Sequence, residues 1–224
     1  FHTMRVDPQN PADPDRDRFV LSKGHCTPAL YATLALRGYY AVEELELFRS
    51  IKGHMSGHPD MVNVKGVDMS TGSLGQGISA AVGMAIAGKL DGKDYRVYAA
   101  LGDGEIEEGQ VWEAAMFADH YKLDNLCFII DNNDLQIDGR VGEVSSPYPI
   151  DEKFRAFGFE VFCCDGHDFA ALEETFQKVL NVTGKPAAII AKTIKGNGVS
   201  YMEDQVGWHG KAPNDAEYEQ GMKE

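Results

Sequence analysis

Two apolar runs, each ending in a short polar motif, constrain the fold of this chain more than any other feature. Val97 to Leu101 leads into Gly102-Asp103-Gly104, and Leu126 to Asp131 leads into Asn132-Asn133. Each run is short, apolar and bounded by turn residues, which is typical of a buried strand. The 27 residues between the two motifs leave room for a helix, which we predict at Glu108 to Tyr121. The pattern therefore predicts a βαβ unit with two parallel strands.

The two motifs carry the oxygen ligands that a hard cation prefers. The carboxyl ends of parallel strands meet at one edge of a sheet, where open α/β sheets bind ligands, so we expect Asp103 and Asn133 side by side. A carboxylate and an amide carbonyl suit Mg²⁺, which completes its coordination with phosphate oxygens and water. Either motif alone is equally well explained as a turn or as an ordinary strand exit. Their matched spacing favours a site for a metal and a diphosphate.

Composition and charge indicate one domain that does not bind nucleic acid. The chain has 224 residues, of which 43% are hydrophobic, enough for a sizeable single core. Its net charge of −14 argues against a nucleic-acid partner, because phosphate backbones are bound by clustered Lys and Arg. The sequence shows neither an apolar stretch of membrane-helix length nor a signal-peptide pattern, so we expect a cytoplasmic protein. The four cysteines form no C-x-x-C pair, and we expect reduced core residues.

The alternation of elements predicts an α/β fold, a doubly wound and mostly parallel sheet with helices on both faces. We expect a single domain with a helical and loop lead-in at 1–72, an α/β core at 73–200 and a C-terminal loop and helix at 201–224. Glycines at 75, 77, 83 and 88 imply close packing of one helix, because each costs helix stability. The further strands expected are Phe159 to Cys164 and Ala187 to Thr193, and the further helices are Thr27 to Arg37, Val42 to Ile51, Leu74 to Leu90, Asp151 to Phe157 and Phe169 to Leu180.

Six motifs follow one another across nearly the whole chain: Arg16 to His25, Gly57-His58-Pro59-Asp60, Ser70 to Gly77, Gly102 to Gly109, Gln136 to Gly139 and Trp208-His209-Gly210. Both the motifs and their order resemble the amino-terminal part of transketolase. The resemblance implies the thiamine-diphosphate-binding fold of that family. It also implies a reaction that depends on thiamine diphosphate and Mg²⁺, the transfer of a two-carbon glycolaldehyde unit from a ketose phosphate to an aldose phosphate.

The resemblance assigns particular residues to the cofactor and its metal. Asp103, Asn133 and the backbone oxygen of Leu135 would bind Mg²⁺. Thiamine diphosphate carries the carbon chemistry, so the protein mainly orients the cofactor and moves protons. The cofactor-binding positions implied are His25, Gly72, Ser73, Leu74, Asp103, Gly104, Asn133 and His209.

The resemblance also assigns catalytic roles to His25, His58, His209 and Glu108. His58 would hydrogen-bond the donor sugar, and His209 would lie near both the diphosphate and the substrate, where an imidazole can transfer protons at neutral pH. Glu108 would join Glu113 in a carboxylate network across a subunit interface. Both acids could instead only offset the dipole at the start of a helix.

A second polypeptide is implied as well. Transketolases use a glutamate of the following, pyrimidine-binding domain to protonate the cofactor, and this sequence lacks that domain, the C-terminal domain and a family substrate histidine upstream of Phe1. We expect the amino-terminal subunit of a split transketolase, inactive alone, whose partner is a C-terminal subunit in an assembly with two copies of each. The expected substrates are sugar phosphates of the pentose phosphate pathway. Two alternatives are another thiamine-diphosphate enzyme subunit, of the deoxyxylulose-phosphate synthase or 2-oxo-acid dehydrogenase type, and a non-catalytic transketolase-like binding subunit.

Overall fold

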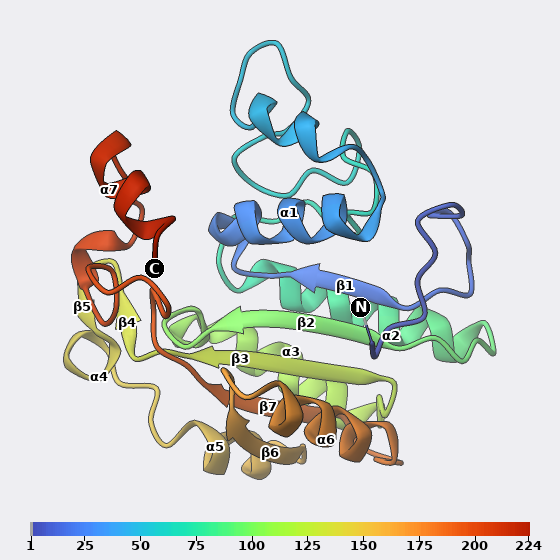
Figure 1. Ribbon diagram of the computed structural model, residues 1–224. Helices are drawn as coiled ribbons and strands as arrows, with labels where there is room; N and C mark the ends of the chain where they lie inside the picture. The colour runs from blue at the N-terminus through green and yellow to red at the C-terminus, as the bar shows by residue number, and fades with distance from the viewer. Residues whose placement is uncertain (1) are drawn as a thin grey trace.

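A five-stranded parallel sheet forms the centre of the molecule. The computed structural model describes residues 2–224. Neighbouring strands follow the order β1-β2-β3-β7-β6, and all of their pairings are parallel (Figure 1). All carboxyl ends therefore lie at one edge. The strands are β1 (Arg18–Leu21), β2 (Val97–Gly102), β3 (Leu126–Asn132), β6 (Glu160–Asp165) and β7 (Ala187–Lys192).

Helices cover both faces of this sheet, as the sequence predicts for a doubly wound fold. The helices α2 (Gln76–Leu90), α3 (Gly109–His120) and α5 (Ile150–Ala156) share one buried cluster with the strands. The opposite face packs against α6 (Phe169–Leu180), through Val179 and the ring of Phe176. The chain crosses to β6 at the sheet edge and returns to β7, and this reversal moves α6 to the other face because such crossovers are right-handed.

A smaller hydrophobic cluster lies beside the sheet around α1 (Thr27–Arg37). It joins α1 to the 3₁₀ helix η2 (Val42–Leu47) and to the loop that follows, with Tyr31 and Met55 fully buried. This cluster supports the loop that carries His58, because the hydroxyl of Tyr31 donates to the backbone oxygen of His58 (3.2 Å). The remaining elements are η1 (Gly24–Cys26), η3 (Glu105–Glu107), β4 (Leu135–Gln136), β5 (Gly139–Arg140), α4 (Val141–Val144), η4 (Val206–Trp208) and α7 (Asp215–Gly221).

The four predicted strands all exist, each within about one residue of its expected ends. The helix expected at Val42 to Ile51 is instead a 3₁₀ helix that ends at Leu47. The helix expected from Leu74 begins at Gln76, because Gly75 takes a left-handed conformation (φ 79°) that only glycine adopts easily. The cysteines are free, but the expectation of core positions is correct only for Cys127 and wrong for Cys163, which is exposed.

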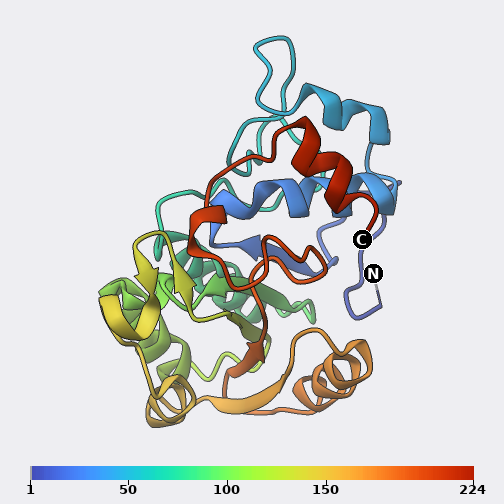
Figure 2. The ribbon, with the colours of Figure 1, turned by 60° about the vertical axis from the view of Figure 1, so that its left-hand side comes forward.

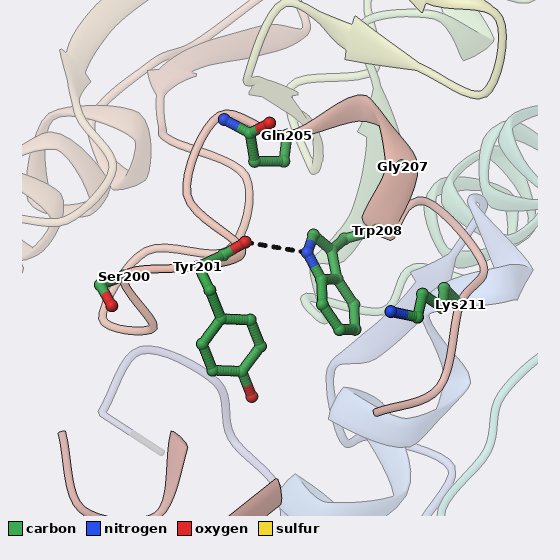
Figure 3. Close-up of a pocket in the computed structure, with 6 residues that line it drawn as sticks. All are labelled: Ser200, Tyr201, Gln205, Gly207, Trp208 and Lys211. Carbon is green, nitrogen blue, oxygen red and sulfur yellow. Dashed lines mark hydrogen bonds between the residues drawn. The ribbon is translucent and has the colours of Figure 1, made fainter. Parts of the chain in front are cut away.

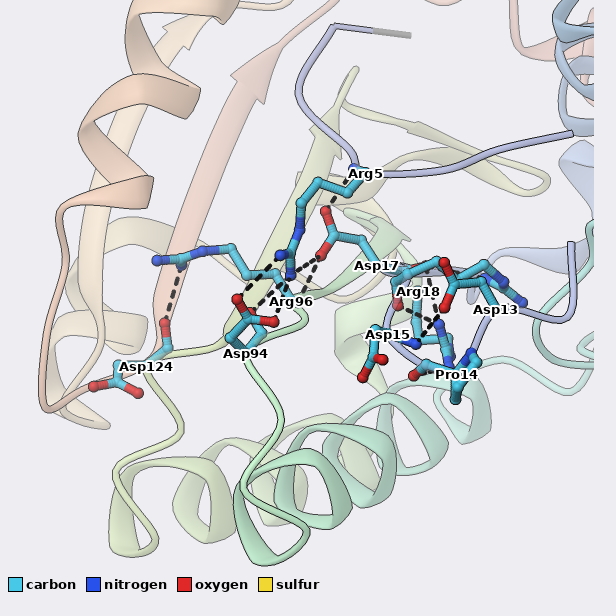
Figure 4. A network of polar contacts seen from close by, with 10 residues as sticks. Arg5, Asp13, Pro14, Asp15, Asp17, Arg18, Asp94, Arg96 and Asp124 are labelled. Carbon is cyan, nitrogen blue, oxygen red and sulfur yellow. Dashed lines mark hydrogen bonds and ion pairs between the residues drawn. The ribbon is translucent and has the colours of Figure 1, made fainter. Parts of the chain in front are cut away.

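Strand β1 lies in the segment where the sequence predicted helices and loops. Its apolar run is only three residues long and is preceded by charged residues, so a strand pattern is hard to detect. Polar contacts hold this segment on the amino edge of the sheet (Figure 4). The buried Asp17 accepts from the backbone N–H of Arg5 (2.8 Å) and of Arg96 (2.8 Å), and the Arg5 guanidinium pairs with Asp94 (3.1 Å).

Within residues 2–224, every helix is too short or too polar to span a bilayer.

Two glycines of α2 provide a matched test of helix-to-strand packing. A Cβ added at Gly77 would lie 2.8 Å from Oγ and 2.9 Å from Cα of the buried Ser22, whereas one added at Gly83 meets nothing within 4 Å. We expect Gly77→Ala to lower the free energy of unfolding by about 1–3 kcal/mol through overpacking. Gly83→Ala should raise it by up to about 1 kcal/mol through helix propensity.

Urea denaturation of both variants measures the difference. Equal stability of the two variants would contradict the close approach of α2 to the exit of β1.

Candidate functional site

The exits of four strands surround one cavity at the carboxyl edge of the sheet. Its volume is about 120 Å³. Figure 2 brings this edge forward and shows the red segment after β7 passing across the strand ends. The residues that line the cavity come from six separate stretches of the chain and include Lys23, His25, Cys26, Leu74, Asp103, Gly104, Glu105, Asp131, Asn133, Leu135, Gln136, Ile137, Lys195 and His209.

Asp103 is the buried acid of this cavity, with 1% of its surface exposed. Its Oδ2 accepts hydrogen bonds from Nδ2 of Asn132 (3.0 Å) and from the backbone N–H of Asp134 (2.5 Å). Its Oδ1 accepts one, from the backbone N–H of Gly104 (2.9 Å). Burial raises the pKa of Asp103 in spite of these donors. A carboxylate oxygen has room for two donors or ligands, so Oδ1 keeps one position for a cation.

The three predicted metal ligands meet at this point. Asn133 and Leu135 line the cavity together with Asp103, and the amide oxygen of Asn133 accepts from the backbone N–H of Leu135 (3.1 Å). No group of three His, Cys, Asp or Glu side chains within residues 2–224 is placed to hold a metal. One carboxylate, one amide and one carbonyl would leave several positions to phosphate oxygens and water, which fits Mg²⁺ bound with a diphosphate.

An ion pair lies in the same cavity as Asp103, where β1 ends. Lys23 pairs with Asp131, whose carboxylate also accepts from the hydroxyl of Thr193. Burial tends to raise the pKa of Asp131, but Lys23 and Thr193 outweigh burial and lower the pKa overall. The pair therefore stays ionised and links the exits of β1, β3 and β7.

A second buried carboxylate joins three other segments. Glu105, 3% exposed, accepts from the hydroxyl of Ser22 (2.5 Å) and from the backbone N–H groups of Gly75 (3.0 Å) and Gly102 (3.1 Å). Burial raises the pKa of Glu105. These contacts bring the exit of β1, the start of α2 and the exit of β2 to the same cavity.

Two of the predicted histidines stack at the cavity. The ring centroids of His25 and His209 are 5.2 Å apart, with an angle of 29° between their planes. Partial burial, then His209 and Lys23, lowers the pKa of His25 to about 4. Partial burial, then Lys195 and Lys23, also lowers the pKa of His209. Both imidazoles are therefore neutral at physiological pH and able to accept a proton.

The segment before His209 is held by its own aromatic contacts. Nε1 of Trp208 donates to the backbone oxygen of Tyr201 (2.9 Å), and Nζ of Lys211 lies 3.9 Å from the centre of a Trp208 ring. Figure 3 shows these side chains around a second, open pocket of about 410 Å³. These contacts show that Trp208 packs within its own segment. They position the turn from which His209 reaches the first cavity.

His58 and the Gly72 loop lie next to each other. A Cβ added at Gly72 would come within 3.0 Å of the ring of His58, and one added at Gly24 would come within 2.7 Å of the backbone nitrogen of Gly72. These close approaches bring three predicted positions together, since His25 follows Gly24 directly. Leu74 lines the cavity, whereas Ser73 is exposed beside it.

Glu108, like His58, is a predicted catalytic residue that does not line the cavity. It precedes α3 as its N-cap, is exposed, and is outside the residues that line the cavity in the part of the chain described by the structure. Glu113 is exposed on the same helix. The predicted network between subunits therefore stays a prediction, because it needs a surface from another chain.

Several residues of the site were not predicted as members of it, among them these four: Lys23, Glu105, Asp131 and Gln136. Nε2 of Gln136 donates to Glu107 (3.0 Å), and a Cβ at Gly104 would lie 3.2 Å from Cβ of Gln136. Each of the four occurs inside or directly beside a motif quoted from the sequence. Their positions close to the ends of predicted strands are the sequence signal that could have identified them as residues of the site.

Comparison with known proteins gives one family. A family model described as the transketolase, thiamine diphosphate binding domain matches residues 1–224. A 6-deoxy-6-sulfo-D-fructose transketolase subunit from Clostridium sp. is 46% identical over 93% of this chain and 76% of its own length. An apulose-4-phosphate transketolase subunit from Phocaeicola vulgatus is 43% identical over 100% of this chain and 79% of its own length.

Solved structures show the same fold. Transketolase from Campylobacter jejuni matches 98% of this chain with a TM-score of 0.93 and 34% identity. Pichia stipitis transketolase in complex with sedoheptulose 7-phosphate also matches 98%, with a TM-score of 0.94 and 33% identity. The chain spans only 36% and 34% of these two proteins.

Removing the charge of Lys195 should change the titration of both stacked histidines. Lys195 disfavours imidazolium, so Lys195→Gln should raise the pKa of His209 and of His25. Between pH 6.5 and about 4 the unfolded chain binds a proton that folded His25 does not. The free energy of unfolding therefore falls as pH decreases through this window, and the variant should lose less stability there.

Histidine ring signals in NMR titrations measure the pKa values directly. Lys178→Gln, on α6, is the control and should leave them unchanged. Unchanged values in Lys195→Gln as well would mean that Lys195 does not face the pair.

Proposed function

The chain belongs to the family of transketolase thiamine diphosphate binding domains, and on that basis we propose that it is one subunit of a two-component transketolase. The proposed reaction moves a two-carbon glycolaldehyde unit from a ketose phosphate to an aldose phosphate, with thiamine diphosphate and Mg²⁺. The observation that carries this proposal is one cavity that combines the buried carboxylate of Asp103, whose Oδ1 accepts only one hydrogen bond, with two neutral histidines.

The residues at the strand exits suit the diphosphate end of the cofactor. Asp103, Asn133 and the backbone oxygen of Leu135 would hold Mg²⁺, and Lys195 would add positive charge beside the phosphates. His209 supports this fit, because its Nδ1 is buried and has no hydrogen-bond partner within residues 2–224. When bound, thiamine diphosphate supplies the carbon centre that takes up and releases the two-carbon unit.

The histidines would handle protons of the sugar. His209 and His25 are neutral, so each can accept a proton from a sugar hydroxyl and return it to an alkoxide. His58 lies against the Gly72 loop at the same mouth and would hydrogen-bond the donor sugar. The ring portion of the cofactor would contact Gly72, Ser73 and Leu74. Gly104 has no side chain, so Gln136 can pack closely against the turn after β2, which would bind the diphosphate.

A partner subunit is part of the proposal. The cavity holds about 120 Å³, less than the roughly 300 Å³ or more of typical cofactor pockets, which supports a second surface that completes it. The partner would carry the pyrimidine-binding and C-terminal domains, in two copies of each subunit, with Glu108 at the interface. Relatives named as transketolase subunits support this arrangement. A cytoplasmic location and a pentose phosphate role stay predictions.

Substrate choice needs a panel of sugars. Two relatives that cover 93% and 100% of this chain are named for different substrates, a sulfosugar and apulose 4-phosphate. We therefore include xylulose 5-phosphate, 6-deoxy-6-sulfofructose and apulose 4-phosphate as donors, with ribose 5-phosphate or glyceraldehyde 3-phosphate as acceptor.

Coupled assays should detect transfer only when both polypeptides are present. With xylulose 5-phosphate and ribose 5-phosphate as one pair, the readout is glyceraldehyde 3-phosphate formed by this chain alone or with the polypeptide encoded next to it. His209→Ala should lower kcat by about 10²-fold or more, because a proton-transfer group is lost. Asp103→Ala should abolish binding of thiamine diphosphate that depends on Mg²⁺.

His54→Ala is the control, since His54 lies in a loop and faces Glu44 (3.6 Å) instead of the cavity. Transfer by the isolated chain would contradict the two-component arrangement. Cofactor binding by the mixture without transfer on any sugar pair, but with carbon dioxide release from pyruvate, would point to a different thiamine enzyme.

A further inference from the structure

One oxygen of the Asp103 carboxylate, Oδ2, is part of a closed ring of hydrogen bonds. Oδ2 of Asp103 accepts from Nδ2 of Asn132 (3.0 Å), which also donates to the hydroxyl of Tyr148 (2.8 Å). That hydroxyl donates to Oδ1 of Asp134 (3.0 Å), and the backbone N–H of Asp134 returns to Oδ2 of Asp103 (2.5 Å). Four residues, from the turn after β2, from β3, from the loop after β3 and from the loop before α5, thus close one circuit.

The ring of hydrogen bonds determines which carboxylate oxygen of Asp103 remains available to a cation. Oδ2 takes two donors and is saturated, whereas Oδ1 takes only the backbone N–H of Gly104 (2.9 Å). Rotation of the carboxylate would break both bonds at Oδ2 and leave buried donors without partners, which is costly. The orientation of the carboxylate is therefore set by residues outside the cavity lining.

The backbone of Asp134 is in a conformation that suits this task. Its φ of 65° is left-handed, a region that few residues other than glycine adopt and that Asp and Asn tolerate. In this conformation its N–H reaches Asp103 while its carboxylate reaches Tyr148. Arg140 adds a second contact to that carboxylate (3.2 Å) and also pairs with Asp204 (2.7 Å), which ties the ring to the segment after β7.

We propose that Tyr148 and Asp134 are positioning residues for the divalent cation. Through the ring they hold Oδ2 of Asp103 away from the cavity and leave Oδ1 for the metal. Neither residue lies in a motif that resembles the family, and neither lines the cavity. This inference rests on the proposed function, since the cation at Asp103 belongs to it.

Tyr148→Phe removes one hydroxyl and keeps the ring of the side chain. We expect the apparent Kd for Mn²⁺, measured by electron paramagnetic resonance on the chain mixed with the polypeptide encoded next to it and a fixed concentration of thiamine diphosphate, to rise about three- to tenfold, the effect of one neutral hydrogen bond. Thermal unfolding without cation or cofactor should stay close to wild type. Tyr218→Phe, at a side chain 54% exposed on α7, is the matched control and should not change the Kd.

Asp134→Gly provides an independent test, because glycine adopts the same φ and keeps the N–H to Asp103. It should weaken Mn²⁺ binding by a similar factor. The double variant should bind little worse than the weaker single variant, because both changes open the same ring.

Each other outcome overturns the inference. Wild-type Kd in Tyr148→Phe, or a lower thermal midpoint with an unchanged Kd, would show that the hydroxyl only stabilises the loop. If the wild-type chain mixed with its partner polypeptide shows no Mn²⁺ binding that depends on the cofactor, the proposed function fails together with the inference. If wild type binds and both variants bind equally well, only the inference fails.

Discussion

The carboxylate of Glu105 is the contact on which the arrangement of the site depends. A buried carboxyl group must be satisfied by hydrogen-bond donors, and here the donors come from three different parts of the chain. Each donor directly precedes or follows a residue that lines the cavity: Ser22 precedes Lys23, Gly75 follows Leu74, and Gly102 precedes Asp103. One side chain therefore joins three loops of the site.

Close contact between backbone segments also brings loops of the site together. Gly24 and Gly72 approach so closely that a Cβ at Gly24 would overlap the backbone nitrogen of Gly72. Side chains at either position would push the loop that carries His25 away from the loop that carries His58. Glycine is thus required here for reasons of space, and the convergence of the predicted histidines is a consequence of backbone packing.

The positive charges in the cavity explain how a strongly acidic chain can bind the negatively charged diphosphate of the cofactor. The net charge is −14, yet Lys23 and Lys195 both line the small cavity. Lys23 is balanced by Asp131, while the effect of Lys195 on the histidines shows that positive potential reaches the mouth. Partial burial keeps both imidazoles neutral and this potential adds to the effect, so binding of phosphate and acceptance of protons are supported by one local arrangement. A divalent cation at Asp103 would add to it.

The sequence by itself determined the βαβ unit, the doubly wound sheet and the meeting of Asp103 with Asn133. These follow from local patterns, since apolar runs, turn residues and crossover length are all encoded in neighbouring residues. Only the tertiary structure decided the strand at Arg18–Leu21, the partners of Glu105, the ring through Tyr148 and the position of Glu108 outside the cavity. The physical reason is distance along the chain: Ser22 and Glu105 are 83 residues apart, and such contacts depend on how packed elements bring loops together, which no local pattern records.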